Sequence, residues 1–281
     1  MKSRGVIYYN RGTGCLARLI VSLQSLREHY DGNVSIICAD IESEVYIKKI
    51  ANKFGAIAIL WNSPVSKGKG QVFLETTLAA DYTPYSTTIW LDADTIVVGD
   101  VTDLFQQAEE NEIAMTQFSN WTMAQGIIRR RIKSWADIYP KRVKRYVGKP
   151  EYQSLNCGVY GFITESKFMQ DWYKFAEPGR SRFIPNEVAM QLSIWEYPHL
   201  VADQKYNCSC KYSDINDPDV RVIHYHGKKH CRMDENKNVL FNGNLWVDRY
   251  EKILEENLCD IHSYLPLILK HDRTLRRYTK R

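Results

Sequence analysis

The sequence lacks long apolar runs. No stretch of its 281 residues has the length and apolar character of a membrane-spanning helix. The first residues, MKSRGVIYYN, lead directly into a strand pattern without the apolar segment of a signal peptide. These two absences predict a cytoplasmic protein.

Disordered and repeated segments are also missing, and so is the cysteine pattern of a disulfide framework. The seven cysteines are an odd number spread over a long chain, which favours reduced thiols over a disulfide framework. The glycosylation triplets at Asn120 and Asn207 are then chance matches. There is no internal repeat and no low-complexity segment. With 44% apolar and 25% charged residues, the chain is expected to fold around a sizeable core.

Strand and helix patterns alternate along the first hundred residues, which is typical of βαβ units and a mainly parallel sheet. We predict strands over Val6–Tyr9, Val34–Ala39, Ala56–Trp61, Thr87–Asp92, Ile113–Phe118, Gly158–Ile163 and Val220–Tyr225. We predict helices over Leu16–His29, Ser43–Phe54, Gln71–Ala80, Val101–Glu110, Ser166–Phe175, Asn186–Trp195 and Trp246–Asn257. The fold class is therefore α/β.

Two carboxylates, Asp92 and Asp94, stand at the end of the strand in TTIWLDADTIVVGDV, residues 87–101. Ligands bind at this edge of an open α/β sheet. In an extended segment the alternation of side chains aims both acids the same way, and oxygen ligands suit Mg²⁺ or Mn²⁺. An isolated pair of this kind is more often two solvated loop acids.

This segment closely resembles the metal-binding motif of GT-A-fold glycosyltransferases, in particular family 8, the group of glycogenin and bacterial lipopolysaccharide galactosyltransferases. Further segments follow in family order, so the resemblance extends over roughly residues 5–230. It implies a GT-A fold with a Rossmann-like central sheet and one catalytic domain over residues 1–281. It also implies Mn²⁺ (or Mg²⁺), held by the two acids, and a nucleotide-sugar donor, with UDP as the expected nucleotide.

The segment SLNCGVYGF, residues 154–162, is similar to the family strand that faces the donor sugar. The resemblance gives Asn156 an amide contact with sugar hydroxyls, and Gly158 a close backbone approach to the ligand. From the residues alone, Asn and Gly also serve the geometry of a turn that enters a strand.

The segment VRVIHYHGKKH, residues 220–230, resembles the family element that follows the last strand. The resemblance makes His224 a third metal ligand, gives Gly227 a backbone contact, and assigns phosphate binding to Lys228 or Lys229. The chain departs from the family at His230, where a lysine is usual. Histidines and cysteines at positions 208–231 also leave a structural zinc site as an alternative, with buried thiols as the simpler expectation.

A helix start in PNEVAMQ, residues 185–191, matches the position where the family carries an Asp-Gln pair near the reaction centre. Here the pair is Asn186-Glu187. The resemblance implies retention of anomeric configuration, and a carboxylate at this position is suited to act as a covalent nucleophile or a general base. An acid in the first turn of a helix is otherwise favoured by the helix dipole.

The loop after the first strand is expected to contact the nucleoside, with Tyr8, Tyr9 and Asn10 as the candidates. Strand alternation predicts that at least one of Tyr8 and Tyr9 lies in the core. Lys69, in a glycine-rich loop, is a candidate phosphate contact, and its alternative is an ordinary solvated lysine.

Basic residues gather in two places. Nine lie from Arg129 to Lys149 against one acid, Asp137, within a variable insertion at 119–153 that we expect to be helical and on the acceptor side. A solvated helix face is the default explanation, and the alternatives are an anionic or glycan acceptor: lipid-linked glycan, lipopolysaccharide or nucleic acid. The tail at 259–281 is suited to peripheral membrane contact.

Two other function classes remain as alternatives. A metal-dependent nucleotidyltransferase also uses a nucleotide-binding α/β sheet, but Gly12-Thr13-Gly14 is a poor phosphate loop. A nucleic-acid-binding protein on the same fold would not need the acid and histidine set.

Overall fold

The computed structural model describes residues 3–210, 212–225 and 244–255. These fall into two compact units, each built from several chain segments. The first unit holds residues 3–7, 62–91 and 102–207, and the second holds residues 8–61, 92–101 and the described residues from 208 onward. The prediction of one catalytic domain stays a prediction.

Seven strands form one sheet in the order β3-β2-β1-β4-β7-β6-β8, and three form a second sheet in the order β5-β10-β9. The larger sheet contains β1 (Arg4–Asn10), β2 (Val34–Cys38), β3 (Ile57–Leu60), β4 (Thr87–Leu91), β6 (Ile113–Thr122), β7 (Gln153–Ile163) and β8 (Leu200–Ala202). The smaller sheet contains β5 (Thr95–Val97), β9 (Cys208–Ser209) and β10 (Val222–His224). The pairs β1–β4, β2–β3 and β6–β8 are parallel, and β7 is antiparallel to both of its neighbours. The α/β class with a mainly parallel central sheet is confirmed.

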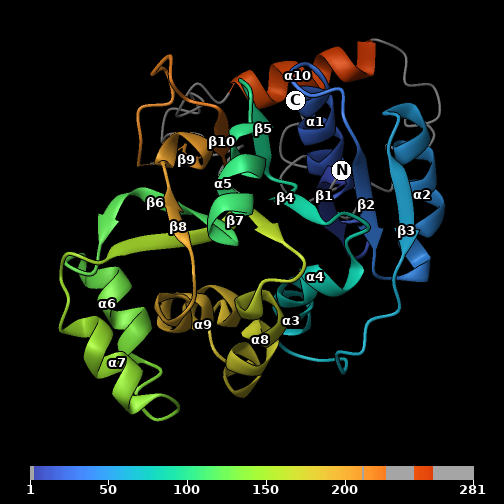
Figure 1. Cartoon of the computed structure of the whole chain (residues 1–281). Helices are drawn as coiled ribbons and strands as arrows, with labels where there is room; N and C mark the ends of the chain where they lie inside the picture. The colour runs from blue at the N-terminus through green and yellow to red at the C-terminus, as the bar shows by residue number, and fades with distance from the viewer. Residues whose placement is uncertain (1–2, 211, 226–243, 256–281) are drawn as a thin grey trace, which may run out of the picture. The chain divides into compact units, whose positions relative to one another are not determined.

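In the first unit, helices cover both faces of the sheet (Figure 1). The helix α5 (Asp103–Asn111) packs on β7, and a Cβ added to Gly161 would come within 2.5 Å of the Leu104 carbonyl oxygen. Only glycine therefore permits this close approach. The preceding residue, Tyr160, points to the opposite face of the sheet. There the centroid of its ring lies 5.8 Å from that of the Trp172 ring. Trp172 lies on α8 (Lys167–Ala176), which packs against α9 (Pro185–Ser193).

The remaining elements of the first unit are short. The predicted helix Gln71–Ala80 is divided into α3 (Gln71–Glu75), a 3₁₀ turn and α4 (Ala79–Tyr82). The basic insertion forms α6 (Gly126–Lys133) and α7 (Pro140–Val147), as expected of a helical segment. Each is amphipathic, with Ile128 and Ile132 buried on α6, and Val143 and Tyr146 buried on α7.

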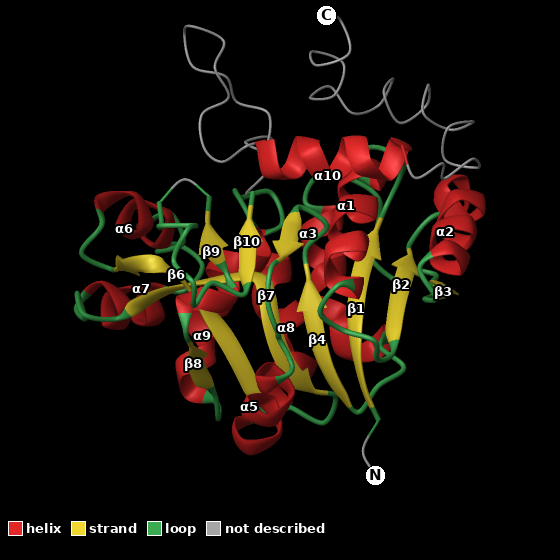
Figure 2. Cartoon of the chain, turned by 90° about the horizontal axis from the view of Figure 1, so that it is seen from above, coloured by secondary structure: helices red, strands yellow, loops and turns green. Residues whose placement is uncertain are grey.

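In the second unit, α2 (Ile41–Lys53) packs on β2 and β3, while α1 (Leu16–Arg27) packs on β5 and on α10 (Asn244–Glu255) (Figure 2). The helix α2 begins where the carboxylate of Asp40 accepts from the backbone N–H of Ser43, a hydrogen bond that satisfies a free donor of the first turn. Within the described ranges no helix is long and apolar enough to cross a membrane.

Candidate functional site

Asp92 and Asp94 lie in the tight connection between β4 and β5, so a turn, and not strand alternation, brings them together. The turn is closed by Thr95, whose backbone N–H and hydroxyl both donate to the carbonyl of Asp92, at 3.2 and 2.8 Å. The sequence-based prediction of a strand extending through Asp92 was therefore one residue too long. The structure nevertheless brings the two acids to the same side, as expected.

A buried chain of hydroxyls holds this turn. The Thr95 hydroxyl lies 2.9 Å from that of Ser22, which lies 3.0 Å from the phenol of Tyr8. Because Thr95 already donates to Asp92, it accepts from Ser22, and Ser22 in turn accepts from Tyr8. Burial raises the pKa of Tyr8, so its phenol stays protonated and serves as a donor.

His224 is the last residue of β10, which pairs antiparallel to β5 with His224 opposite Thr95. The next residue, Tyr225, donates its backbone N–H to the carbonyl of Asp94 at 2.9 Å. These backbone contacts fix the ring in register with the turn, and His224 is only 3% exposed.

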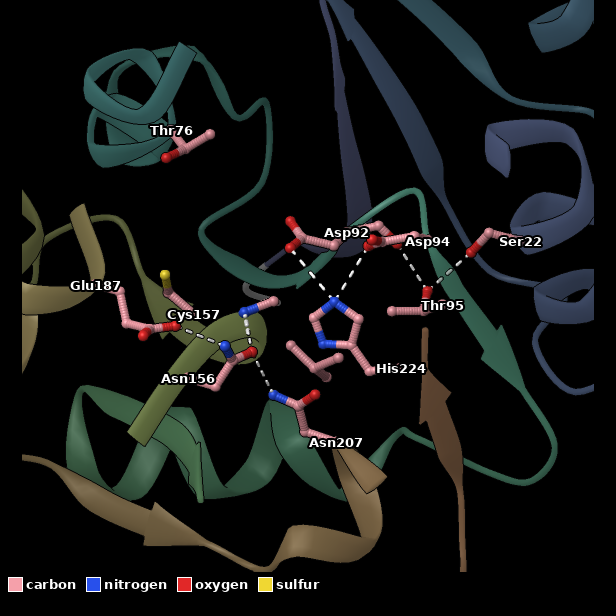
Figure 3. Close-up of polar contacts among 12 residues, drawn as sticks. Ser22, Thr76, Asp92, Asp94, Thr95, Asn156, Cys157, Glu187, Asn207 and His224 are labelled. Atoms are coloured by element: carbon pink, nitrogen blue, oxygen red, sulfur yellow. Dashed lines mark hydrogen bonds and ion pairs between the residues drawn. The ribbon is translucent and has the colours of Figure 1, made fainter. Parts of the chain in front are cut away.

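The three side chains converge on one point (Figure 3). Nε2 of His224 lies 3.1 Å from Oδ1 of Asp94 and 3.7 Å from Oδ2 of Asp92, and one ligand atom from each residue falls within 4.8 Å of the others. Ligands of a single divalent cation at bond lengths near 2.1 Å lie about 3 to 4 Å apart. The set therefore fits a divalent cation, and two carboxylates with an imidazole suit Mn²⁺.

A second polar group lies within the first unit, around Glu187 in the first turn of α9. Its Oε2 accepts from Nδ2 of Asn156 at 2.7 Å, and its Oε1 accepts from the Arg131 guanidinium at 3.1 Å (the Asn156 bond is drawn in Figure 3). The Glu187 side chain is 15% exposed and that of Arg131 is 29% exposed. The carboxylate is thus largely desolvated and held from two sides.

The orientation of Asn156 is fixed by donors to its Oδ1. The backbone N–H of Gly158 and Nδ2 of Asn207 each donate to it at 2.9 Å. Asn207 also donates to the Thr116 hydroxyl at 2.8 Å. With its oxygen engaged, the amide must present its nitrogen toward Glu187.

Other predicted residues take separate places. Asn186 is buried and turns its amide to the Thr76 hydroxyl at 3.1 Å and to Cys157 at 3.5 Å. Lys69 is exposed in the loop before α3. Gly227, Lys228 and Lys229 lie outside the described residues.

At the end of β1, one of the two tyrosines lies in the core, as expected. Tyr8 is fully buried and Tyr9 is half-buried. Asn10 is 2% exposed, and its amide nitrogen donates to Gly12 and Ser43. Its Oδ1 is buried without a partner among the described residues. A buried acceptor of this kind is suited to a ligand N–H.

Sequence reasoning did not identify Arg131, Thr95, Asn207 and Thr116 as site residues. Arg131 is one of nine basic residues without a distinguishing signal, and the sequence offers Asn207 only as a chance glycosylation triplet. The signal available for Thr95 is its place directly after the two acids, where a hydroxyl commonly closes a turn.

No protein-family model matches the chain, and no curated protein matches it. Solved structures do share its fold. The galactosyltransferase LgtC, solved with donor and acceptor sugar analogs, aligns with a TM-score of 0.61 at 14% identity over 88% of this chain and 95% of LgtC. An apo structure of the bifunctional glycosyltransferase WbbM gives 0.61 at 10% identity over 89% of this chain. GlyE of Streptococcus pneumoniae TIGR4 gives 0.59 at 16% identity over 92% of this chain.

The chain spans 50% of the WbbM chain and 64% of the GlyE chain. At these identities the likeness establishes the fold. The GT-A fold expected from the family resemblance is confirmed.

Proposed function

We propose that this chain is a glycosyltransferase that moves a hexose from a nucleotide sugar, with UDP as the nucleotide, to an acceptor hydroxyl. The observation that carries the proposal is the convergence of Asp92, Asp94 and His224 on a fold shared with glycosyltransferases. The shared fold favours this activity over nucleotidyl transfer and over simple nucleic-acid binding.

In this proposal the three converging residues hold Mn²⁺. When bound, the cation neutralises negative charge on a diphosphate and stabilises it as a leaving group. The Oδ1 of Asn10, which has no partner among the described residues, supports a nucleoside contact beside Tyr9. Lys69, Gly227 and either Lys228 or Lys229 are proposed to contact the donor phosphates, as the family resemblance implies.

Glu187 is the proposed reacting group at the anomeric carbon. Arg131 and Asn156 hold both of its oxygens in place, which supports an ionised carboxylate. Two roles remain for it, a covalent nucleophile in a retaining reaction or a general base. Asn156 retains a second amide hydrogen for a sugar hydroxyl, and Asn186 is proposed to position the helix start through Thr76.

The acceptor is proposed to be a glycan or another anionic molecule, with a lipid-linked glycan, lipopolysaccharide and nucleic acid as the alternatives. The supporting feature is the positive charge of α6 and α7, and α6 also contributes Arg131 to the Glu187 group.

A donor panel tests the proposal. The protein is incubated with UDP-glucose, UDP-galactose or GDP-mannose, with Mn²⁺ or with chelator, and nucleotide release is measured. We expect slow, Mn²⁺-dependent release from one UDP-sugar. The anomeric configuration of the product, read by NMR, then separates retention from inversion. If no nucleotide sugar gives metal-dependent release or binding, the proposal is wrong.

A further inference from the structure

The helix pair α6 and α7 displays more positive charge than the acids among the described residues pair with. Arg131, Arg142 and Arg145 are engaged in ion pairs with Glu187 and Glu196. Five further basic residues of the pair and its C-terminal end are exposed: Arg130, Lys133, Lys141, Lys144 and Lys149. Within the described part of the chain, none of these five has an ion pair. Their charge is therefore available to a partner.

Two large apolar side chains are exposed beside this charge. Phe183 is 67% exposed and Ile127, on α6, is 38% exposed. The guanidinium of Arg131 lies over the Phe183 ring at 5.1 Å from its centroid, which ties Phe183 to α6. Ile127 precedes Arg130 by three positions and Arg131 by four, so these side chains share one side of the helix.

The backbone next to Phe183 is strained. Ile184 has a φ of 41°, a left-handed conformation that is costly for a β-branched residue. Ile184 is half-buried at the N-terminal cap of α9, while Phe183 remains in solvent. Folding alone favours neither the strain nor the exposed ring. Together they indicate that Phe183 is displayed for a partner.

We propose that this face docks the protein on an anionic lipid bilayer. We define the docking face by Phe183, which Arg131 ties to α6, and by the exposed residues Ile127, Arg130 and Lys133 of that helix. Basic side chains are attracted to acidic headgroups, and apolar side chains between them enter the boundary of the acyl chains.

The apolar residues favour a bilayer over single-stranded nucleic acid. Non-specific binding of single strands depends on aromatic rings on which bases stack. Ile127 has no ring, and one side of the Phe183 ring is occupied by Arg131. Docking involves no chemical step, so the proposal is tested apart from the proposed enzyme activity.

Vesicle sedimentation with the full chain tests the docking face. We expect binding to vesicles of equal parts phosphatidylcholine and phosphatidylglycerol, and at least about tenfold weaker binding to pure phosphatidylcholine or at high salt. The double variant Arg130→Gln, Lys133→Gln is expected to bind acidic vesicles about 25-fold more weakly, because each removed charge lowers the affinity about fivefold. Phe183→Ser is expected to bind them about tenfold more weakly.

The matched control is Lys49→Gln with Lys53→Gln, two exposed lysines on α2, which should bind as the wild type does. Thermal melting followed by circular dichroism checks that each variant is folded. The proposal is overturned if acidic vesicles are not bound, or if the α6 variant binds them as strongly as the control. It is also overturned if the variants lose affinity only for single-stranded RNA of mixed sequence.

Discussion

The guanidinium of Arg131 donates to the carboxylate of Glu187 across 3.1 Å, although 56 positions separate the two residues in the chain. Arg131 comes from the basic insertion and Glu187 from the first turn of α9. The contact brings one member of the basic segment to the proposed reaction centre.

Replacing Arg131 tests that role. In Arg131→Met we expect kcat to fall by about 10- to 100-fold with little change in the KM for the donor, because the carboxylate loses one of the two contacts that position it. Arg131→Lys keeps the charge but not the planar fork, and should recover part of the loss. Equal kcat values for Arg131→Met and wild type would exclude a role for Arg131 in positioning Glu187.

Glu187→Gln separates chemistry from binding. The amide is nearly the same size but is a poor nucleophile and base, so transfer should fall by about 100- to 10,000-fold while donor binding is kept. The measurement pairs a transfer assay with calorimetric titration of the donor. Asn186→Ala is the comparison at the neighbouring position. Normal turnover by Glu187→Gln would exclude a chemical role for this residue.

Thr95→Val tests the hydroxyl chain behind the metal ligands. Valine cannot donate to the carbonyl of Asp92 or accept from Ser22, so a buried donor is left without its partner. We expect a loss of about 1 to 3 kcal/mol in the free energy of unfolding, and about tenfold weaker Mn²⁺ binding.

Thr164→Val, in the first unit, is the matched control for that experiment. Its hydroxyl makes two long contacts, 3.5 Å to the Ser86 carbonyl and 3.3 Å to the exposed Glu165 carboxylate, so its replacement should change neither the free energy of unfolding nor Mn²⁺ affinity appreciably. Mn²⁺ affinity in Thr95→Val equal to that of this control would contradict the positioning role.

Asp171 on α8 gives a pH-dependent prediction. Hydrogen bonds from Lys174 and also from Lys167 lower the pKa of its carboxyl. A lowered pKa in the folded state stabilises the protein above the unfolded value of about 3.9, and the contribution is lost as pH falls through the folded pKa. Asp171→Asn should therefore lower the free energy of unfolding by less than about 1 kcal/mol at neutral pH, because the two lysines are exposed.

Urea unfolding at neutral pH and near pH 3 measures this effect. The difference in the free energy of unfolding between Asp171→Asn and wild type should be smaller at the acidic pH than at neutral pH. A difference that stays constant with pH would show that the carboxylate contributes through packing alone.

Local patterns in the sequence predicted much of the fold. The strand β4 and its two acids were identified because a buried apolar run ends directly at Asp92. The short strand β5 was missed because Thr95–Val97 is three residues long and pairs with β10, more than 100 positions away. The extension of β6 to Thr122 was also missed, since its pairing with β7 is irregular between Gln117 and Thr122.

Some residues of the candidate site were predicted and others were not, because the latter depend on contacts between distant positions in the chain. The three metal-site residues were predicted from a short motif together with the family resemblance, and the structure brings their ligand atoms together. The contacts of Glu187 depend on Arg131 and Asn156, which lie 56 and 31 positions away. No spacing rule links such positions, and only the folded chain shows them as neighbours.

The most direct test is calorimetric titration of UDP into the wild-type protein, with Mn²⁺ and with chelator. We expect binding that requires Mn²⁺ and that weakens by at least about a hundredfold in Asp94→Asn and in His224→Ala. UDP binding that is equal with and without Mn²⁺, or that is unchanged in Asp94→Asn, would contradict a metal-dependent nucleotide-sugar site.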